Sequence, residues 1–471
     1  MRLTRINKLF LQICFLLIAG IQLQAQKVYT VSAKQAVELA FQEVGRIKNA
    51  KIDYQIAEAR NKEITGLALP QVSASFQGNH YLSLPLIQFP DASELQIYDV
   101  LDREGVKDAN GNPIDPNNAE FKLQNFSFIA PWNVVGGLSV NQLLFDPQVF
   151  VGLQARKTYL EQTKINIEVE EISVKESVSK AYFAVLIAEK QLGYIQESVK
   201  RLEKLANDMN LMYKNGFAEK LDIDRTTVNL NNTRTTENQL KIVMAIGYAS
   251  LKAAMGLKQI DSLHLTDALT PDRVKEGVLD ESFAYENRSE VRLLQKTIEL
   301  QGYDVRRYKL MYAPTVSASY NLQRNGQHNT TYESTTGKSW FWYNTNFIGL
   351  NVSVPIFDGF QKKHKIKQTQ YSLDKTSNLL EDTKKLVDME ITTSKNTLAT
   401  AILTMDAQEK NMQLAESVFN TVRKKYQEGI GSSFEVLQTD TDLQQSQSNY
   451  FRALYEAMIA KINYLKALGK L

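Results

Sequence analysis

Three short segments of this sequence occur twice, in the same order, and this duplication limits the possible folds more than any other feature. The pairs are PQVSASF (70–76) with PTVSASY (314–320), GLSVNQLLFD (137–146) with GLNVSVPIFD (349–358), and YKNGFAEKLDI (213–223) with YQEGIGSSFEV (426–436). Self-similarity at this scale is typical of a repeated supersecondary unit. The sequence therefore predicts two structural repeats, residues 26–257 and 258–471.

The first two pairs of segments show the period of a strand. Apolar and polar residues alternate along them, as expected for a strand with one apolar face. The alternating apolar positions are Val72, Ala74, Phe76, Leu138, Val140 and Leu144 in the first copy, and Leu350, Val352, Val354 and Ile356 in the second. We expect one strand hairpin in each repeat, at about 68–146 and 312–358.

The two hairpins differ in the segment that connects their strands. The first copy holds an insertion within residues 86–132, where LPLIQFPDAS and NGNPIDPNN are rich in turn-forming residues. The matching segment of the second copy, 324–345, is shorter. Both are predicted to be polar loops, and we hypothesise that the longer one shields the outer mouth of the molecule.

Between the hairpins the period changes to that of a coiled coil. Apolar residues separated by alternating threes and fours, with a single lapse, are Val178, Tyr182, Val185, Ala188, Leu192, Ile195, Val199, Leu202, Ala206 and Met209. A helix of roughly 65 residues would be about 100 Å long. The second copy matches it at 360–426.

Each long helix is followed by a short turn that contains glycine and then by another helix, at 221–255 and 434–468. A glycine at a helix end supplies the left-handed residue that closes it, which places the tips at Gly216 and Gly429. The result is one antiparallel helical hairpin per repeat, at about 147–255 and 359–468. Shorter helices, about 49–67 and 289–311, lead into the first strand of each repeat.

The N-terminus reads as a secretory signal peptide, residues 1–25. Basic residues precede an apolar run and then Leu23-Gln24-Ala25. Cleavage would remove Cys14, the single cysteine, and would leave 52 basic and 52 acidic residues. A formal charge near zero argues against a nucleic-acid partner. No later stretch offers about 18 consecutive apolar residues, so any membrane crossing would have to use strands.

Four strands cannot close a barrel, and an open sheet edge in lipid would leave unpaired backbone groups that each cost several kcal/mol. Single-chain outer-membrane barrels have about 8 or more strands, and three chains would supply about 12. The predicted fold is therefore an α+β membrane protein, in which a long antiparallel coiled-coil barrel joins a transmembrane β-barrel with four strands per chain, closed as a trimer.

The duplicated hairpin-and-helix plan, the strand ending GLxVxxxxFD and the tip YxxGxxxxxxV together resemble the TolC-like outer membrane efflux family over essentially the whole mature chain. The resemblance implies a homotrimeric exit duct in the outer membrane of a Gram-negative bacterium, with outer-membrane lipids around it. It also implies two partners, a periplasmic adaptor (membrane fusion) protein and an inner-membrane transporter, and it implies no particular cargo.

In the family, carboxylates just beyond the tip glycine line the periplasmic entrance, which points to Glu435 and Asp222 here. Three copies of a carboxylate would make a negative ring that favours cations. The alternative is that these charges simply complement the helix dipole in solvent.

Two other entrance positions depart from the family. Gln438 stands where many relatives have a second acid, and Gly431 stands where others have an arginine. Tyr426 matches a position of the family's closing network. Asp440 and Asp442 could compensate for the missing acid, although solvated positions on a helix face are expected for both.

Two further groups of residues follow from the resemblance and from general physics. The hairpin tips correspond to the family's adaptor contact, and they comprise Asn215, Gly216, Phe217, Ala218, Glu428, Gly429, Ile430 and Gly431. Aromatic rings near the strand ends suit a membrane interface, and they are Tyr81, Trp132, Trp340, Trp342 and Tyr343, with loop packing nearly as good an explanation for Trp132.

The sequence carries no enzyme signal. His80, His264, His328 and His364 are scattered without ligand spacing, and there is no nucleophile elbow, phosphate loop or HExxH motif. We therefore expect no catalytic residues, metal or cofactor. The alternative to a duct is a surface-anchored coiled-coil scaffold or adhesin, and an envelope hydrolase is disfavoured by the missing catalytic residues.

Overall fold

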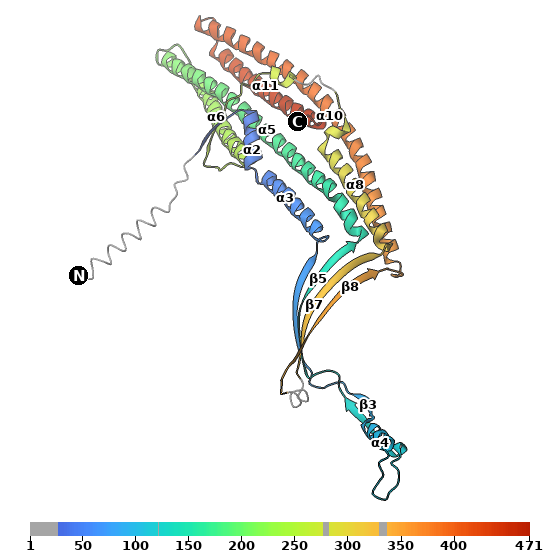
Figure 1. Cartoon of the computed structure of the whole chain (residues 1–471). Helices are drawn as coiled ribbons and strands as arrows, with labels where there is room; N and C mark the ends of the chain where they lie inside the picture. The colour runs from blue at the N-terminus through green and yellow to red at the C-terminus, as the bar shows by residue number, and fades with distance from the viewer. Residues whose placement is uncertain (1–26, 121, 277–281, 329–336) are drawn as a thin grey trace, which may run out of the picture. The chain divides into compact units, whose positions relative to one another are not determined.

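We analysed a computed structural model of the chain, which describes residues 27–120, 122–276, 282–328 and 337–471. The chain divides into two compact units. One is mainly helical and comprises the described residues of 27–60, 155–304 and 367–471. The other comprises 61–154 and 305–366 and contains the main sheet. Figure 1 shows the helices and strands in chain order from blue to red.

The main sheet has four antiparallel strands in the order β2-β5-β7-β8. Their bounds are β2 Gln71–His80, β5 Trp132–Phe145, β7 Thr315–His328 and β8 Phe341–Ser353. Both predicted hairpins are present as strand pairs, β2 with β5 and β7 with β8, and β5 also pairs with β7 (Figure 1). Strands β2 and β8 are therefore the two edges of this sheet.

The prediction that residues 86–132 form a polar loop is wrong. This insertion folds into a small antiparallel hairpin, β3 Ile87–Asp91 with β4 Lys122–Phe126, which encloses helix α4 Ser93–Arg103 and the short 3-10 helix η1 Pro116–Asn118. Many of its turn-forming residues lie between these elements, and the apolar runs within the elements are too short to give a clear periodic signal. Turns are therefore present, but they occupy only parts of residues 86–132.

Two strand boundaries also differ from the prediction. In the second hairpin, β7 continues to His328 and β8 begins at Phe341, so much of the expected loop 324–345 is strand, and residues 329–336 lie outside the described part. At its other end β8 stops at Ser353, although the alternation continues through Val354 and Ile356. Pro355 explains this end, because proline cannot donate to a sheet ladder.

Four long helices dominate the helical unit, as the coiled-coil spacing predicts. Helix α5 Pro147–Lys214 has 68 residues and α10 Gln361–Gln427 has 67, while α6 Lys220–Ala254 and α11 Ser433–Ala467 have 35 each. Nine of the ten predicted seam residues of α5 are buried, and Ala206 is partly buried. Burial of this continuous stripe, at about 25 cal/mol for each Å² of apolar surface, stabilises helices far longer than globular domains usually contain.

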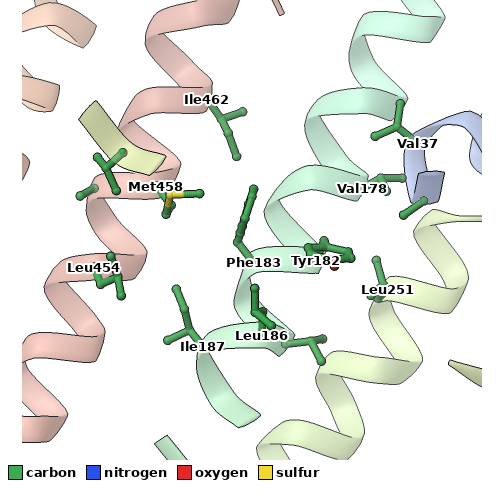
Figure 2. Packing of buried hydrophobic residues seen from close by; sticks show 14 of the residues in the cluster. Val37, Val178, Tyr182, Phe183, Leu186, Ile187, Leu251, Leu454, Met458 and Ile462 are labelled. Atoms are coloured by element: carbon green, nitrogen blue, oxygen red, sulfur yellow. The ribbon is translucent and has the colours of Figure 1, made fainter. Parts of the chain in front are cut away.

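The centre of the core lies where α5 meets its neighbours. Tyr182 and Leu186 of α5 lie between Leu251 of α6 on one side and Leu454 and Met458 of α11 on the other (Figure 2). These side chains come from both halves of the sequence. The two helical hairpins therefore share one apolar core within this unit.

Short elements complete the helical unit. They are β1 Val28–Val31, α2 Ala33–Glu43, β6 Ser262–Leu265, α7 Asp272–Lys275 and η2 Tyr285–Asn287. Helices α3 Gly45–Gly66 and α8 Ser289–Lys309 extend from this unit into the other, which also holds η3 Leu310–Tyr312. Ser32 and Gln35 form a reciprocal capping box at the start of α2. The parallel pairing of β1 with β6 was not predicted. None of the described helices is long and apolar enough to cross a membrane.

Candidate functional site

The two hairpin tips have the same backbone geometry. Gly216 and Gly429 adopt φ values of 80° and 79°, in the left-handed region that glycine enters without strain. At the first tip, the N–H of Gly216 donates to Tyr213 O at 3.0 Å and that of Phe217 to Met212 O at 2.8 Å. The second tip repeats both bonds, from Gly429 to Tyr426 O at 3.0 Å and from Ile430 to Lys425 O at 3.1 Å. This pair of hydrogen bonds is the Schellman motif that ends a helix.

The second tip requires a further glycine. A Cβ at Gly431 would lie 2.9 Å from the backbone N of Tyr426, closer than real Cβ contacts come. Ser432 is the N-cap of α11, and its Oγ accepts from the N–H of Glu435 at 3.2 Å. Any side chain at position 431 would therefore require this turn to shift.

The beginnings of α6 and α11 meet. The Ser433 hydroxyl lies 3.3 Å from Oδ1 of Asp222, and Asp222 is half-buried. Glu435 is exposed one turn further along α11 than the cap. Gln438 is also exposed, and its Nε2 donates to Asp442 Oδ1 at 3.0 Å. The structure thus brings Asp222 to the second tip, while Glu435 and Gln438 are directed to solvent.

Tyr426 connects the two hairpins through sulfur contacts. Its hydroxyl lies 3.6 Å from the Sδ of Met212 and 3.9 Å from that of Met209, both on α5. Burial raises the pKa of the Tyr426 hydroxyl, and the carboxylates of Asp208 and Asp222 raise it further. Thioether sulfur is a weak acceptor, so Tyr426 contributes here mainly through packing.

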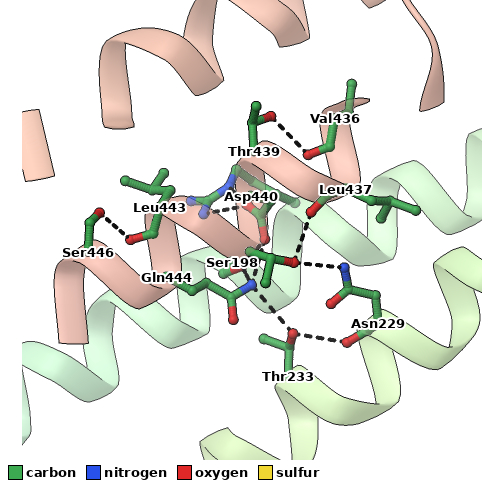
Figure 3. Close-up of polar contacts among 12 residues, drawn as sticks. Ser198, Asn229, Thr233, Val436, Leu437, Thr439, Asp440, Leu443, Gln444 and Ser446 are labelled. Carbon is green, nitrogen blue, oxygen red and sulfur yellow. Dashed lines mark hydrogen bonds and ion pairs between the residues drawn. The ribbon is translucent and has the colours of Figure 1, made fainter. Parts of the chain in front are cut away.

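The expectation of a solvated Asp440 is wrong, because its side chain is 1% exposed. Its carboxylate accepts from Ser198 Oγ at 2.7 Å, from Gln444 Nε2 at 2.6 Å, and from Nε and Nη2 of Arg201 at 3.1 and 2.9 Å (Figure 3). A buried charge is tolerated only when it is paired and hydrogen-bonded in this way. We refer to Ser198, Arg201, Asp440 and Gln444 as the Asp440 cluster.

The Asp440 cluster connects all four long helices. Gln444 of α11 reaches Thr233 Oγ1 of α6 at 3.5 Å (Figure 3). On α10, the ring of Phe419 lies 5.0 Å beneath the Arg201 guanidinium, a cation–π distance. A cavity of about 220 Å³ lies beside the cluster, between α5, α10 and α11. Sequence reasoning missed this cluster, although Asp440 lies in phase with the apolar seam of α11.

The predicted adaptor contacts are at the extreme ends of the hairpins. Phe217 and Ile430 are the most exposed large apolar residues there, at 79% and 78%. Asn215, Gly216, Glu428 and Gly429 are exposed, and Ala218 and Gly431 are half-buried. Isolated apolar residues on a surface are common, but two at equivalent turns suit docking against a partner.

The predicted interface aromatics gather at one end of the main sheet. The ring of Trp132 stacks on His80 at 4.0 Å, and Trp340 lies 5.6 Å from His328 and 5.8 Å from Trp342. Tyr81 and Tyr343 lie at this same end, after β2 and within β8. His80 and His328 are therefore less scattered than the sequence suggests, but the described residues contain no group of three or more His, Cys, Asp or Glu that could hold a metal.

Comparisons with known proteins agree with this architecture. The family model for outer membrane efflux proteins matches residues 283–470. The outer membrane protein TolC of Salmonella enteritidis is 22% identical over 441 residues, covering 92% of this chain and 84% of TolC. The chain is TolC-like: it resembles the outer membrane efflux proteins in sequence over most of its length and in fold.

Two further relatives extend the similarity. The alkaline protease secretion protein AprF of Pseudomonas aeruginosa is 20% identical over 345 residues, covering 72% of this chain and 68% of AprF. The crystal structure of the Campylobacter jejuni CmeC outer membrane channel has the same fold, with a TM-score of 0.67, 15% identity, and coverage of 93% of this chain and 85% of that one.

As a TolC-like protein, the chain is an outer-membrane exit duct of an efflux or secretion system, with its helical part in the periplasm. The family is one of transport channels rather than enzymes.

Proposed function

We propose that three copies of this chain assemble into one passive duct, in which their sheets form a single transmembrane β-barrel. The observation that carries this proposal is the pair of open edges, β2 and β8, on a sheet of four strands. Open edges are not tolerated in lipid, and β8 of one copy beside β2 of the next would satisfy both. Three copies would supply about 12 strands, within the range known for outer-membrane barrels.

Apolar side chains on the outer faces of the helices support the same assembly. Helix α10 exposes Leu379, Leu386, Met389 and Leu403, each at more than half of its surface, and α6 exposes Ile242, Val243 and Ile246 to a similar degree. Such stripes on a long helix suit packing against another helix. Each hairpin would pack against a neighbouring copy, and the six hairpins would close into a coiled-coil barrel.

The residues near the hairpin tips would form the entrance of the duct and its contact with a partner. Glu435, supported by the half-buried Asp222, would form a ring of carboxylates at the periplasmic entrance. The exposed tips would dock onto a periplasmic adaptor, whose inner-membrane transporter supplies the energy. The chain itself would need no cofactor and would catalyse no reaction. The two repeats, 26–257 and 258–471, would each provide one strand hairpin and one helical hairpin.

In-cell photo-crosslinking from Ala218 and Ser432, followed by mass spectrometry, tests this proposal. Lys375 is an exposed control position on α10, away from the tips. We expect both tip probes to capture a periplasmic adaptor and the control probe to capture none. Capture of this chain alone by all three probes, from cells that express functional protein, would favour the scaffold or adhesin instead.

A further inference from the structure

One end of the main sheet carries a concentration of positive charge. Helix α8 leads through η3 into β7 at 306–314, and β8 leads into α10 at 354–365. These two stretches contain six basic residues, namely Arg306, Arg307, Lys309, Lys362, Lys363 and Lys365, against one carboxylate, Asp358. We refer to this surface as the basic junction. Neither Lys309 nor Lys363, both exposed, has an ion-pair partner in the part of the chain that the structure describes.

Aromatic rings are interleaved with these cations and connect the two stretches. The Nζ of Lys362 lies 5.5 Å from the Tyr312 ring, and that of Lys365 lies 5.3 Å from the Tyr308 ring. The Arg307 guanidinium lies 4.8 Å from the same Tyr308 ring. These cation–π contacts hold positive charge on an apolar surface, where it remains available to an anion.

The basic junction also exposes large apolar side chains. Ile356 is 94% exposed, Phe357 is 76% exposed and Phe360 is 58% exposed. Phe360 has a φ of 66°, a left-handed conformation that is costly for a bulky residue. Strained residues persist where the surroundings impose them, and they concentrate at functional sites.

The other strand-to-helix junction of the same sheet provides an internal comparison. Where β5 leads into α5, Phe145 and Phe150 are exposed at 41% and 45% and their rings lie 5.8 Å apart. No basic residue occurs there between Phe145 and Arg156. Exposed phenylalanine side chains thus occur at both junctions, whereas the cluster of basic residues occurs only at the basic junction.

We propose that the basic junction binds the phosphate group of an anionic glycerophospholipid in the periplasm-facing leaflet of the outer membrane. The chain lies in that membrane with its helices in the periplasm, so the junctions between strands and helices fall at the membrane surface. Basic clusters next to a membrane segment attract anionic lipids, and aromatic rings favour the headgroup level. Phe357 and Phe360 enter the boundary of the acyl chains, while Lys309 and Lys363 contact the phosphate.

Native mass spectrometry of the purified full-length mature protein tests this proposal with two lipids of identical acyl chains, phosphatidylglycerol and phosphatidylcholine. We expect the wild type to retain phosphatidylglycerol preferentially. The double variant Lys309→Gln/Lys363→Gln should lose about fivefold in retention per lysine removed. The control Lys157→Gln/Lys164→Gln removes two exposed lysines from α5 and should retain both lipids as the wild type does.

Three outcomes would overturn the proposal. The first is equal retention of the two lipids by the wild type, and the second is equal loss in the double variant and the control. The third is retention of inorganic phosphate, in the absence of lipid, as strong as that of phosphatidylglycerol, which would assign the site to the free ion. The same spectra report the number of chains per particle, so a failure of trimer assembly would be seen separately.

Discussion

Arg201 and Asp440 are 239 residues apart in the sequence, and their side chains form an ion pair at 2.9 Å between Nη2 and Oδ1 in the helical unit. One residue comes from the first helical hairpin and the other from the second. The aspartate is 1% exposed, so its charge is stabilised by these protein partners rather than by bulk water. This contact fixes α11 against α5 a short distance from the second tip.

Removing one partner of this pair should be strongly destabilising. We expect Asp440→Ala to lower the free energy of unfolding by about 3–5 kcal/mol, because the half-buried Arg201 and the Ser198 and Gln444 donors would all lose their shared acceptor. The double variant Arg201→Leu/Asp440→Leu should recover much of that loss, because apolar residues replace both charges. Denaturant unfolding and hydrogen exchange along α11 would measure the two effects.

The Lys200–Glu197 pair is a matched control on α5, since both of its side chains are largely exposed. Glu197→Gln should leave the free energy of unfolding almost unchanged, because exposed ion pairs contribute little to stability. A loss from Asp440→Ala as small as that would show that the buried pair does not hold α11 in place.

The long helices could be predicted from sequence because one periodic signal runs through the second half of α5, from Val178 to Met209. The same signal could have placed Asp440 correctly. It lies three residues after Leu437 and three before Leu443, both buried, so the seam runs through it. A solvent-exposed position was expected for Asp440 because charged side chains on a helix usually face water. Its partners, Ser198 and Arg201, are distant in sequence, and no local pattern shows that they meet it.

Other parts of the fold depend on contacts that no local pattern reveals. Strand β1 is four residues long and pairs with β6, which begins at Ser262, more than two hundred residues later. The insertion offered only short apolar runs between turns, and α4 is amphipathic over no more than three turns. Cap and turn chemistry at Gly216 and Gly429 was predictable, because it depends on a few neighbouring residues. The close approach at Gly431 depends on the exact path of the turn.

Neutralising Glu435 should reduce the preference of the duct for cations. Glu435 is exposed at the start of α11, and three copies around an axis would form a negative ring. We expect Glu435→Gln to shift the reversal potential toward zero in planar bilayers with asymmetric salt. Glu416→Gln is the control, since Glu416 is an exposed carboxylate on a different helix, α10. Identical reversal potentials for wild type and Glu435→Gln would remove Glu435 from the constriction.

Adding a methyl group at Gly431 should disturb the second tip. In Gly431→Ala the new Cβ would lie 2.9 Å from Tyr426 N and 3.2 Å from Lys425 C, so the backbone must move. We expect a cost of about 1–3 kcal/mol, typical of overpacking, and faster proteolysis at the tip. Gly302→Ala is the control, because a Cβ there meets nothing within 4 Å and the site is inside α8. If both variants were equally stable, the close approach would not constrain the turn.

Deleting the insertion should widen the path through the duct. Residues 87–126 form a separate hairpin with an enclosed helix between β2 and β5, rather than a loop that could move aside freely. If this folded element shields the outer mouth, replacing residues 82–131 with a short turn should raise single-channel conductance. Strands β2 and β5 would keep their pairing from Gln71 to His80. Unchanged conductance of a correctly assembled variant would rule out shielding.

Acid should weaken the contact between α5 and α11 that Glu176 makes. Its carboxylate lies 2.6 Å from Lys180 Nζ and 2.8 Å from Lys466 Nζ. Burial alone would raise the pKa of Glu176, but the hydrogen bonds from the two lysines outweigh it and hold the pKa below the ordinary 4.5. A depressed pKa in the folded state stabilises the protein above pH 4.5, and this stabilisation is lost as the pH falls below that value.

Glu176→Gln should therefore lower the free energy of unfolding at neutral pH, and its difference from the wild type should shrink as the pH falls below 4.5. Unfolding curves across this range measure the difference directly. Glu171→Gln on the same helix is the control, since Glu171 makes no ion pair within the described residues and should give a smaller difference at every pH. A constant difference between Glu176→Gln and the wild type would mean that the lysines do not stabilise the charged form of Glu176.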